Sequence, residues 1–183
     1  MSHTDIFFLK KDTFIKSSVK NAFLSAMYVW QHTAKHYCGL ERFPMSFFGD
    51  DLEPMMAVWN YHSRNPGKMK IHDAIAMQST MDNVLLEPSQ WLRLVEAFEL
   101  FGQQHPNSSF VEQAAIIRSV MESDEGKDVV AIGWQQTSVN GDTPWYCCEE
   151  DENGNEIIKV YDPSIGTLHH WLMESVDETE AAA

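Results

Sequence analysis

Long apolar runs and cysteine are both scarce in this sequence. No stretch of the 183 residues approaches the roughly 18 apolar residues that a transmembrane helix requires, which argues against a membrane-spanning protein. Only three cysteines are present, and two of them, Cys147 and Cys148, are adjacent and would point to opposite faces of a strand. The cysteine content therefore excludes a disulfide framework. Because the N-terminus also lacks the pattern of a signal peptide, we expect a cytoplasmic protein.

Basic residues are also few. The chain contains 13 Lys and Arg against 27 Asp and Glu, for a formal net charge of -14. The imbalance is uneven, because residues 1–72 contain nine basic and six acidic residues, whereas residues 73–183 contain four and twenty-one. An acidic surface of this density repels nucleic acid and anionic lipid and attracts basic proteins. We therefore expect a basic protein partner, no direct nucleic-acid binding and no membrane binding; solubility alone is the alternative explanation of the charge.

Sequence motifs for catalysis are missing as well. The chain contains no phosphate-binding glycine loop and no serine nucleophile elbow. No residue pattern implies a cofactor, so we expect none. The sequence therefore gives little positive support for an enzyme.

The strongest periodic pattern lies in residues 12–39. The apolar residues from Ile15 to Tyr37 recur at the spacing of one helical face, which predicts a long amphipathic helix. Asp12 can cap the start of this helix, and Gly39 can take the left-handed conformation that closes its end. We expect much of the remaining chain to pack on this helix.

Four further helices and a C-terminal sheet are expected. Helices are predicted over 52–64, 71–81, 88–102 and 109–121. Strands are predicted over 128–136, 143–149, 156–161 and 167–172, with turns at Asn140-Gly141 and Asn153-Gly154. The fold class is therefore α+β, with about five helices, the long amphipathic one first, followed by a three- to four-stranded antiparallel β-meander. Residues 1–175 would form a single domain, and residues 176–183 a disordered acidic tail.

Two predicted strands carry a pattern known from one enzyme family. The segments 128–134 (DVVAIGW) and 157–163 (IIKVYDP), with Gly166 after them, resemble the C-terminal strands of papain-like cysteine peptidases. The resemblance implies a papain-like fold in which Asp162 orients the catalytic histidine. However, the expected strand has no histidine, and the start of the first helix has no cysteine. The resemblance therefore implies an inactive relative.

His32, His36 and Cys38 form a second candidate site. His32 and His36 are four residues apart and share a helix face, as zinc ligands often do, and Cys38 with His62 or His72 could complete the set. A metal-dependent or cysteine-dependent enzyme that uses Cys38 and His36, with Asp162, is therefore one alternative function. The structural alternative is that these histidines, on the face away from Trp30, complement the helix dipole and that Cys38 is a packing residue.

Acidic and aromatic residues meet in the predicted meander. The residues that we select as a partner-binding surface are Trp134, Trp145, Glu149, Glu150, Asp151, Glu152 and Trp171. Aromatic side chains ringed by acids suit a basic protein, because the acids accelerate association and the aromatic rings anchor the complex. The alternative is that the tryptophans pack in the core and the acids are only solvated.

The leading hypothesis is a non-enzymatic, acidic binding module that captures or inhibits a basic protein. Immunity proteins and antitoxins, which neutralise toxins or other effectors, are small acidic bacterial proteins of this kind, so the analogy rests on charge and size. Trp145 or Trp171 would fill a pocket in the partner. A nucleic-acid mimic that blocks a DNA-binding protein is a further alternative.

Overall fold

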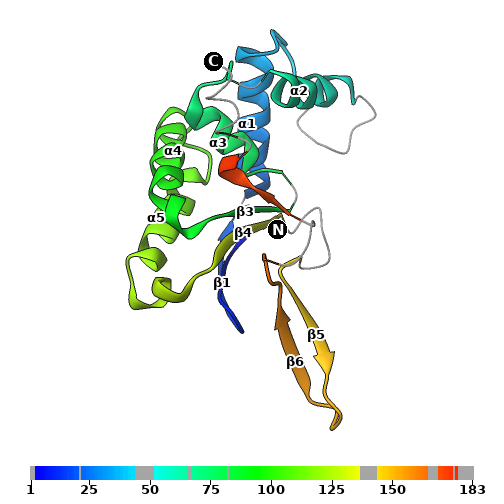
Figure 1. Ribbon diagram of the computed structural model, residues 1–183. Helices are drawn as coiled ribbons and strands as arrows, with labels where there is room; N and C mark the ends of the chain where they lie inside the picture. The colour runs from blue at the N-terminus through cyan, green and yellow to red at the C-terminus, as the bar shows by residue number, and fades with distance from the viewer. Residues whose placement is uncertain are drawn as a thin grey trace.

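Figure 1 shows the computed structural model of the protein, which describes residues 3–20, 22–43, 52–65, 67–81, 83–136, 144–164, 169–174 and 176. Within these ranges, five α-helices and two short 3-10 helices lie between strands that form two sheets. In the same ranges, none of the helices combines the length and the apolar character that crossing a membrane requires.

The elements follow one another along the whole chain. The helices are α1 (Ala22–His36), α2 (Glu53–Arg64), α3 (Ile71–Gln78), η1 (Pro88–Gln90), α4 (Trp91–Gln104), α5 (Phe110–Met121) and η2 (Asp124–Asp128). The strands are β1 (His3–Leu9), β2 (Phe14–Lys20), β3 (Val84–Leu86), β4 (Ala131–Gln136), β5 (Tyr146–Glu150), β6 (Glu156–Val160) and β7 (His170–Trp171).

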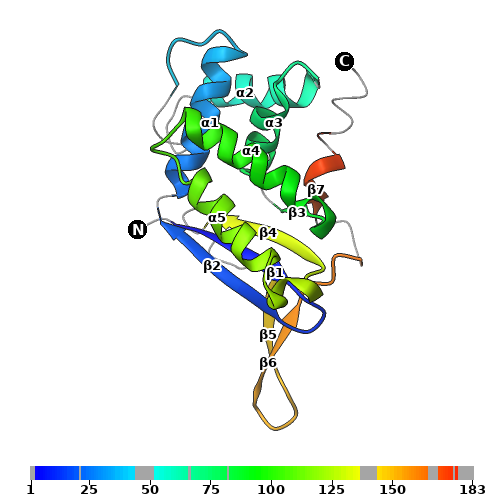
Figure 2. The ribbon, with the colours of Figure 1, turned by 90° about the vertical axis from the view of Figure 1, so that its left-hand side faces the viewer.

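The larger sheet is mixed and has the strand order β2-β1-β4-β3-β7. Strand β1 pairs antiparallel with β2 and β4, β3 pairs antiparallel with β4, and β7 runs parallel to β3. The helices lie on one side of this sheet, and the β5–β6 hairpin projects beyond its other side (Figure 2). Because β1 lies between β2 and β4, this N-terminal strand is an internal strand of the sheet.

The core has two parts, one on each face of β1. Ile6 and Phe8 belong to the large cluster shared with the helices, whereas Phe7 and Leu9 belong to a smaller cluster that includes Trp145. All four β1 residues are fully buried. Because both faces of the strand are covered, its sequence is a continuous apolar run rather than an alternating one.

Gly133 of β4 makes room for Trp145. A Cβ atom at Gly133 would lie 2.7 Å from Cε2 of Trp145 and 2.9 Å from Cδ2 of Leu85, both closer than van der Waals contact. The indole ring, which is only 2% exposed, therefore packs directly against the backbone of β4. This contact attaches the start of the β5–β6 hairpin to the larger sheet.

The predicted helix over residues 12–39 is wrong in its first third. Residues 14–20 form β2, which follows β1 through a turn in which the N–H of Lys10 donates to the C=O of Thr13 at 2.8 Å. Ile15 and Val19 contribute to the core, and their four-residue spacing fits the strand period as well as the helical one. The left-handed conformation of Gly39 is confirmed by its φ of 68°.

The arrangement predicted for the whole chain, helices first and then an antiparallel meander, is also wrong, although the molecule is α+β. Strand β4 pairs with β1 and β3, β5 and β6 form a sheet of their own, and β7 joins the larger sheet. Strand β1 carries apolar side chains on both faces of the sheet and can therefore pair with the buried strand β4. The charged strand β5 could not take this place without burying its charges. The turn at Asn153-Gly154 is confirmed by the φ of 79° at Gly154, whereas Asn140-Gly141 lies outside the described residues.

Helices α2, α3, α4 and α5 occur close to their predicted ranges. In α2, Val58 is buried, whereas Met56 and Trp59 are exposed. At the C-terminus, Val176 is buried in the core, although it was assigned to the acidic tail. Residues 177–183 lie outside the described part of the chain.

Candidate functional site

The β5–β6 hairpin extends away from the rest of the molecule (Figure 1). Its two strands pair with each other from Tyr146–Val160 to Glu150–Glu156, and among the described strands they pair with no other. Every strand residue beyond this first pair is exposed. A two-stranded hairpin is at best marginally stable in water on its own, so its turn and its base must hold it in place.

Asp151 builds the turn of the hairpin. Its Oδ1 accepts hydrogen bonds from the backbone N–H groups of Asn153 and Asn155, both at 2.8 Å, and its Oδ2 accepts one from Nδ2 of Asn155 at 2.9 Å. These hydrogen bonds, chiefly those of Asn155, lower the pKa of the Asp151 carboxyl. Asp151, which was selected for partner binding, therefore has a structural role in the turn.

The two faces of the hairpin differ in charge. Side chains alternate between faces along a strand, and directly paired residues share a face. One face carries Glu149 and Lys159, which form an ion pair. The other face carries Glu150 and Glu156 beside Ile158, with no basic strand residue. This second face, which we call the acidic face, leaves its negative charge unneutralised within the hairpin.

The tryptophans selected as partner anchors are not equally accessible. Trp134 and Trp145 are 4% and 2% exposed, because they fill the two clusters on either side of the sheet. Neither can therefore enter a pocket of a partner in this structure. Trp171 is half-buried, with its ring edge-on to His169 at 5.1 Å between centroids.

In the proposed cysteine-dependent site, Cys38 and Asp162 form hydrogen bonds with other residues instead of with each other. The Sγ of Cys38 donates to the C=O of Ala57 at 3.8 Å, and burial raises the pKa of this thiol, which is the opposite of what a nucleophile needs. Asp162 accepts hydrogen bonds from the N–H and Oγ of Ser164 at 2.9 and 2.6 Å in an exposed turn. The structure therefore does not assemble Cys38, His36 and Asp162 into one site.

The strands that carry the papain-like resemblance, β4 and β6, lie in different sheets. Within the described residues, no group of three or more His, Cys, Asp or Glu is placed to hold a metal ion. His32 and His36 are nevertheless close together, with 4.4 Å between their ring centroids.

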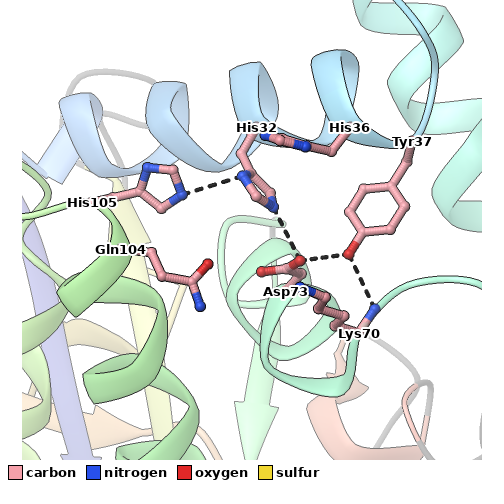
Figure 3. A pocket seen from close by; sticks show the side chains of 7 residues that line it. All are labelled: His32, His36, Tyr37, Lys70, Asp73, Gln104 and His105. Carbon is pink, nitrogen blue, oxygen red and sulfur yellow. Dashed lines mark hydrogen bonds and ion pairs between the residues drawn. The ribbon is translucent and has the colours of Figure 1, made fainter.

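These two histidines belong to a pocket that was not predicted from the sequence (Figure 3). The pocket lies between the end of α1, the start of α3 and the end of α4, and its volume is about 430 Å³. It is lined by His32, His36, Tyr37, Lys70, Asp73, Gln104 and His105. We call it the histidine pocket.

Asp73 is the central acceptor of the histidine pocket and is only 2% exposed. Its Oδ2 accepts hydrogen bonds from Nε2 of His32 at 3.0 Å and from the hydroxyl of Tyr37 at 2.5 Å, and its Oδ1 lies 3.3 Å from Nε2 of His72. Burial alone would raise the pKa of the Asp73 carboxyl, but the hydrogen bonds from His32 and Tyr37 outweigh burial and lower it. Its place in the first turn of α3 also favours a negative charge.

The ionised Asp73 determines where the protons of its neighbours lie. We assign Nε2–H of His32 as the donor to Asp73, which leaves Nδ1 of a neutral His32 as an acceptor. Nε2 of His105 lies 3.2 Å from this Nδ1, and we assign it as the donor of this hydrogen bond. The hydroxyl of Tyr37 also accepts from the backbone N–H of Lys70 at 3.1 Å. Nδ1 of His105 is then left as a proton acceptor at the pocket.

Acidification should destabilise the folded protein in the range where histidine titrates. Burial, reinforced by the neighbouring His32, lowers the pKa of His36 and His105, and burial also lowers the pKa of His62 and His72. The unfolded chain therefore binds more protons than the folded one below about pH 6.5, so the free energy of unfolding should fall as the pH falls through this range. The lowered pKa of Asp73 adds a second loss below about pH 4.

Urea unfolding curves at several pH values between 8 and 5 would measure this dependence. The variant His105→Asn, which removes one of the affected imidazoles, should flatten the curve of stability against pH. A midpoint that stays constant or rises on acidification would contradict the prediction.

Comparison with known proteins adds no family assignment: the chain matches no protein-family profile, no curated protein and no solved structure.

Proposed function

We propose that this protein captures a basic protein partner through the acidic face of its β5–β6 hairpin. The observation that carries the proposal is the hairpin itself, which projects from the molecule (Figure 2) with its strand residues exposed. An exposed two-stranded hairpin contributes little to the stability of a core. Its exposed position suits contact with another molecule.

The charge of the hairpin favours a cationic partner. Glu150 and Glu156 are directly paired across the strands, where like charges destabilise the hairpin. Basic side chains of a partner would relieve that repulsion. Carboxylates at the edge of an interface also accelerate association by steering the partner before contact.

The apolar contact would come from Ile158 rather than from a tryptophan. Ile158 is exposed and lies on the acidic face opposite Cys148. Together with the flanking carboxylates it forms a small apolar centre with a charged rim, the usual arrangement of a protein interface. A toxin or another effector with a cationic active site is the kind of partner that this surface fits.

The double variant Glu150→Gln, Glu156→Gln tests this proposal. It should slow association with the partner by about tenfold at low salt and reduce the dependence of the association rate on salt. The partner would first be recovered from a lysate of the source cells on the immobilised protein, and then purified for rate measurements. A DNA-binding protein that loses its DNA on mixing would instead support nucleic-acid mimicry.

The matched control is Glu87→Gln, Glu96→Gln, which removes the same charge from exposed positions outside the hairpin. The control should associate at nearly the rate of the unchanged protein. Equal slowing in both variants would show that only the overall charge matters, and unchanged association in the hairpin variant would exclude the acidic face as the binding surface.

A further inference from the structure

Several polar groups that face the histidine pocket have no partner. Within the described part of the chain, the ammonium group of Lys70 forms no ion pair, and neither ring nitrogen of His36 forms a hydrogen bond. The Nδ1 of His105 is likewise left over, because only its Nε2 is bonded to His32. Figure 3 shows these side chains around one space, from the end of α1, from the residue before α3 and from the residue after α4.

The carboxylate of the histidine pocket is buried. Among the described residues, Asp73 is the one acidic residue in the lining; it is only 2% exposed, and His32 and Tyr37 use its Oδ2. A ligand that enters the pocket therefore meets the ammonium group, imidazoles and the amide of Gln104 before it meets a carboxylate. These groups are donors, or become donors on protonation, and they suit an anion with several acceptor oxygens.

We propose that the histidine pocket binds a small dianionic oxyanion, such as a phosphate group, through Lys70, His36 and His105. The fixed positive charge of Lys70 supplies attraction at every physiological pH, and the two imidazoles add charged hydrogen bonds when protonated. The volume of about 430 Å³ exceeds that of a lone phosphate and leaves room for the remainder of a phosphate ester. This inference is independent of the hairpin.

Binding of the anion should take up a proton. Without a ligand, burial and the neighbouring His32 and Lys35 on α1 and Lys70 before α3 oppose protonation of His36, whereas Asp73 at the start of α3 favours it. An anion beside the ring reverses that balance and favours the imidazolium form. Because the linkage is reciprocal, protonation must strengthen binding by the same factor by which binding favours protonation.

The hydrogen bonds around His105 allow this protonation without rearrangement. His105 faces His32, His36 and Asp73, and the side chains of α4 that adjoin it, Phe101 and Gln104, are uncharged. A proton added to its Nδ1 leaves the Nε2–H bond to His32 intact. The added N–H is then available to an oxygen of the ligand.

The test uses inorganic sulfate as the probe, because sulfate keeps both negative charges throughout the neutral pH range. The imidazole NMR signals of the full chain would be followed during sulfate titrations at about pH 6 and about pH 8, with sodium chloride keeping the ionic strength constant. Saturable shifts at His36 and His105 are expected. As the pH rises from the pKa of the free imidazole to that of the bound imidazole, the affinity for sulfate should fall by about tenfold for each pH unit.

Two lysine variants make the test specific. Lys70→Ala should weaken sulfate binding by about tenfold, the effect of losing one charged contact. Lys68→Ala is the matched control, because Lys68 is two residues away but bonds to Asn65 outside the pocket lining. Within the part of the chain that the structure describes, the ammonium group of Lys70 forms no ion pair, so its removal should leave the unfolding curve unchanged.

Three results would overturn the proposal: shifts that do not saturate, equal weakening in both lysine variants, or an affinity that does not change with pH. If sulfate binds as expected, inorganic phosphate and phenyl phosphate would be compared at about pH 8. Tighter binding of phenyl phosphate would identify a phosphate ester as the class of ligand, and equal or weaker binding would identify the free anion.

Discussion

Replacing Trp145 by alanine should lower the free energy of unfolding by about 3–5 kcal/mol, the range for a large buried aromatic side chain. The indole fills the smaller core cluster with Phe7 and Leu85 and packs against Gly133. The backbone C=O of Trp145 also accepts a hydrogen bond from Tyr161 at 2.8 Å, which joins the two ends of the hairpin. Loss of the ring should therefore loosen the base of the hairpin as well as the core.

Urea unfolding would measure the loss, and amide hydrogen exchange in β5 and β6 would show whether the hairpin opens more often. Trp59→Ala is the matched control, because Trp59 is 46% exposed on α2 and its removal should cost less than about 1 kcal/mol. Similar losses in the two variants would contradict the anchoring role of Trp145. If the proposed function is right, Trp145→Ala should also weaken partner binding, although the ring is buried.

The elements that could be predicted from the sequence are those with local signals. Helix α4 follows Pro88 and repeats apolar residues at helical spacing, so its range needed no knowledge of the fold. Strand β2 could not be separated from a helix, because Ile15 and Val19 fit both periods. Strand pairing was mispredicted because the partners of β4 are β1 and β3, and no local pattern encodes a contact between such distant segments.

The candidate sites also contain some features that have a local signal in the sequence and others that have none. The acidic residues of the hairpin were visible as a cluster in the sequence, but their distribution over two faces depends on the register of β5 and β6. In the histidine pocket, only the spacing of His32 and His36 was a local signal. Asp73 and His105 lie 41 and 73 residues from His32, so a single sequence contains nothing that links them.

The uneven charge of the sequence has a structural counterpart. The proposed anion-binding groups Lys70 and His36 come from the first 72 residues, which have a small excess of basic residues, whereas the acidic hairpin comes from the remainder. The two proposed sites would therefore attract ligands of opposite charge. If both proposals hold, this separation would allow one chain to bind a cationic protein and a small anion without competition between them.

Replacing Asp73 by alanine should lower the free energy of unfolding by about 2–4 kcal/mol, because it leaves buried donors without an acceptor. The side chain accepts hydrogen bonds from His32, near the end of α1, and from Tyr37, which directly follows α1. The loss should appear in urea unfolding at neutral pH. Asp128→Ala, at an exposed position, should have an effect of less than about 0.5 kcal/mol.

The variant Asp73→Asn separates the charge of this residue from its shape. Asparagine keeps an acceptor oxygen for His32 and Tyr37, so it should destabilise the protein less than alanine does. The negative charge of Asp73 raises the pKa values of His36, His72 and His105, so its removal should lower all three further. NMR titration of the imidazoles would measure these changes. Unchanged pKa values would show that Asp73 holds the histidine pocket together by hydrogen bonds alone, whereas lower values would show that its charge also controls how readily the pocket takes up a proton.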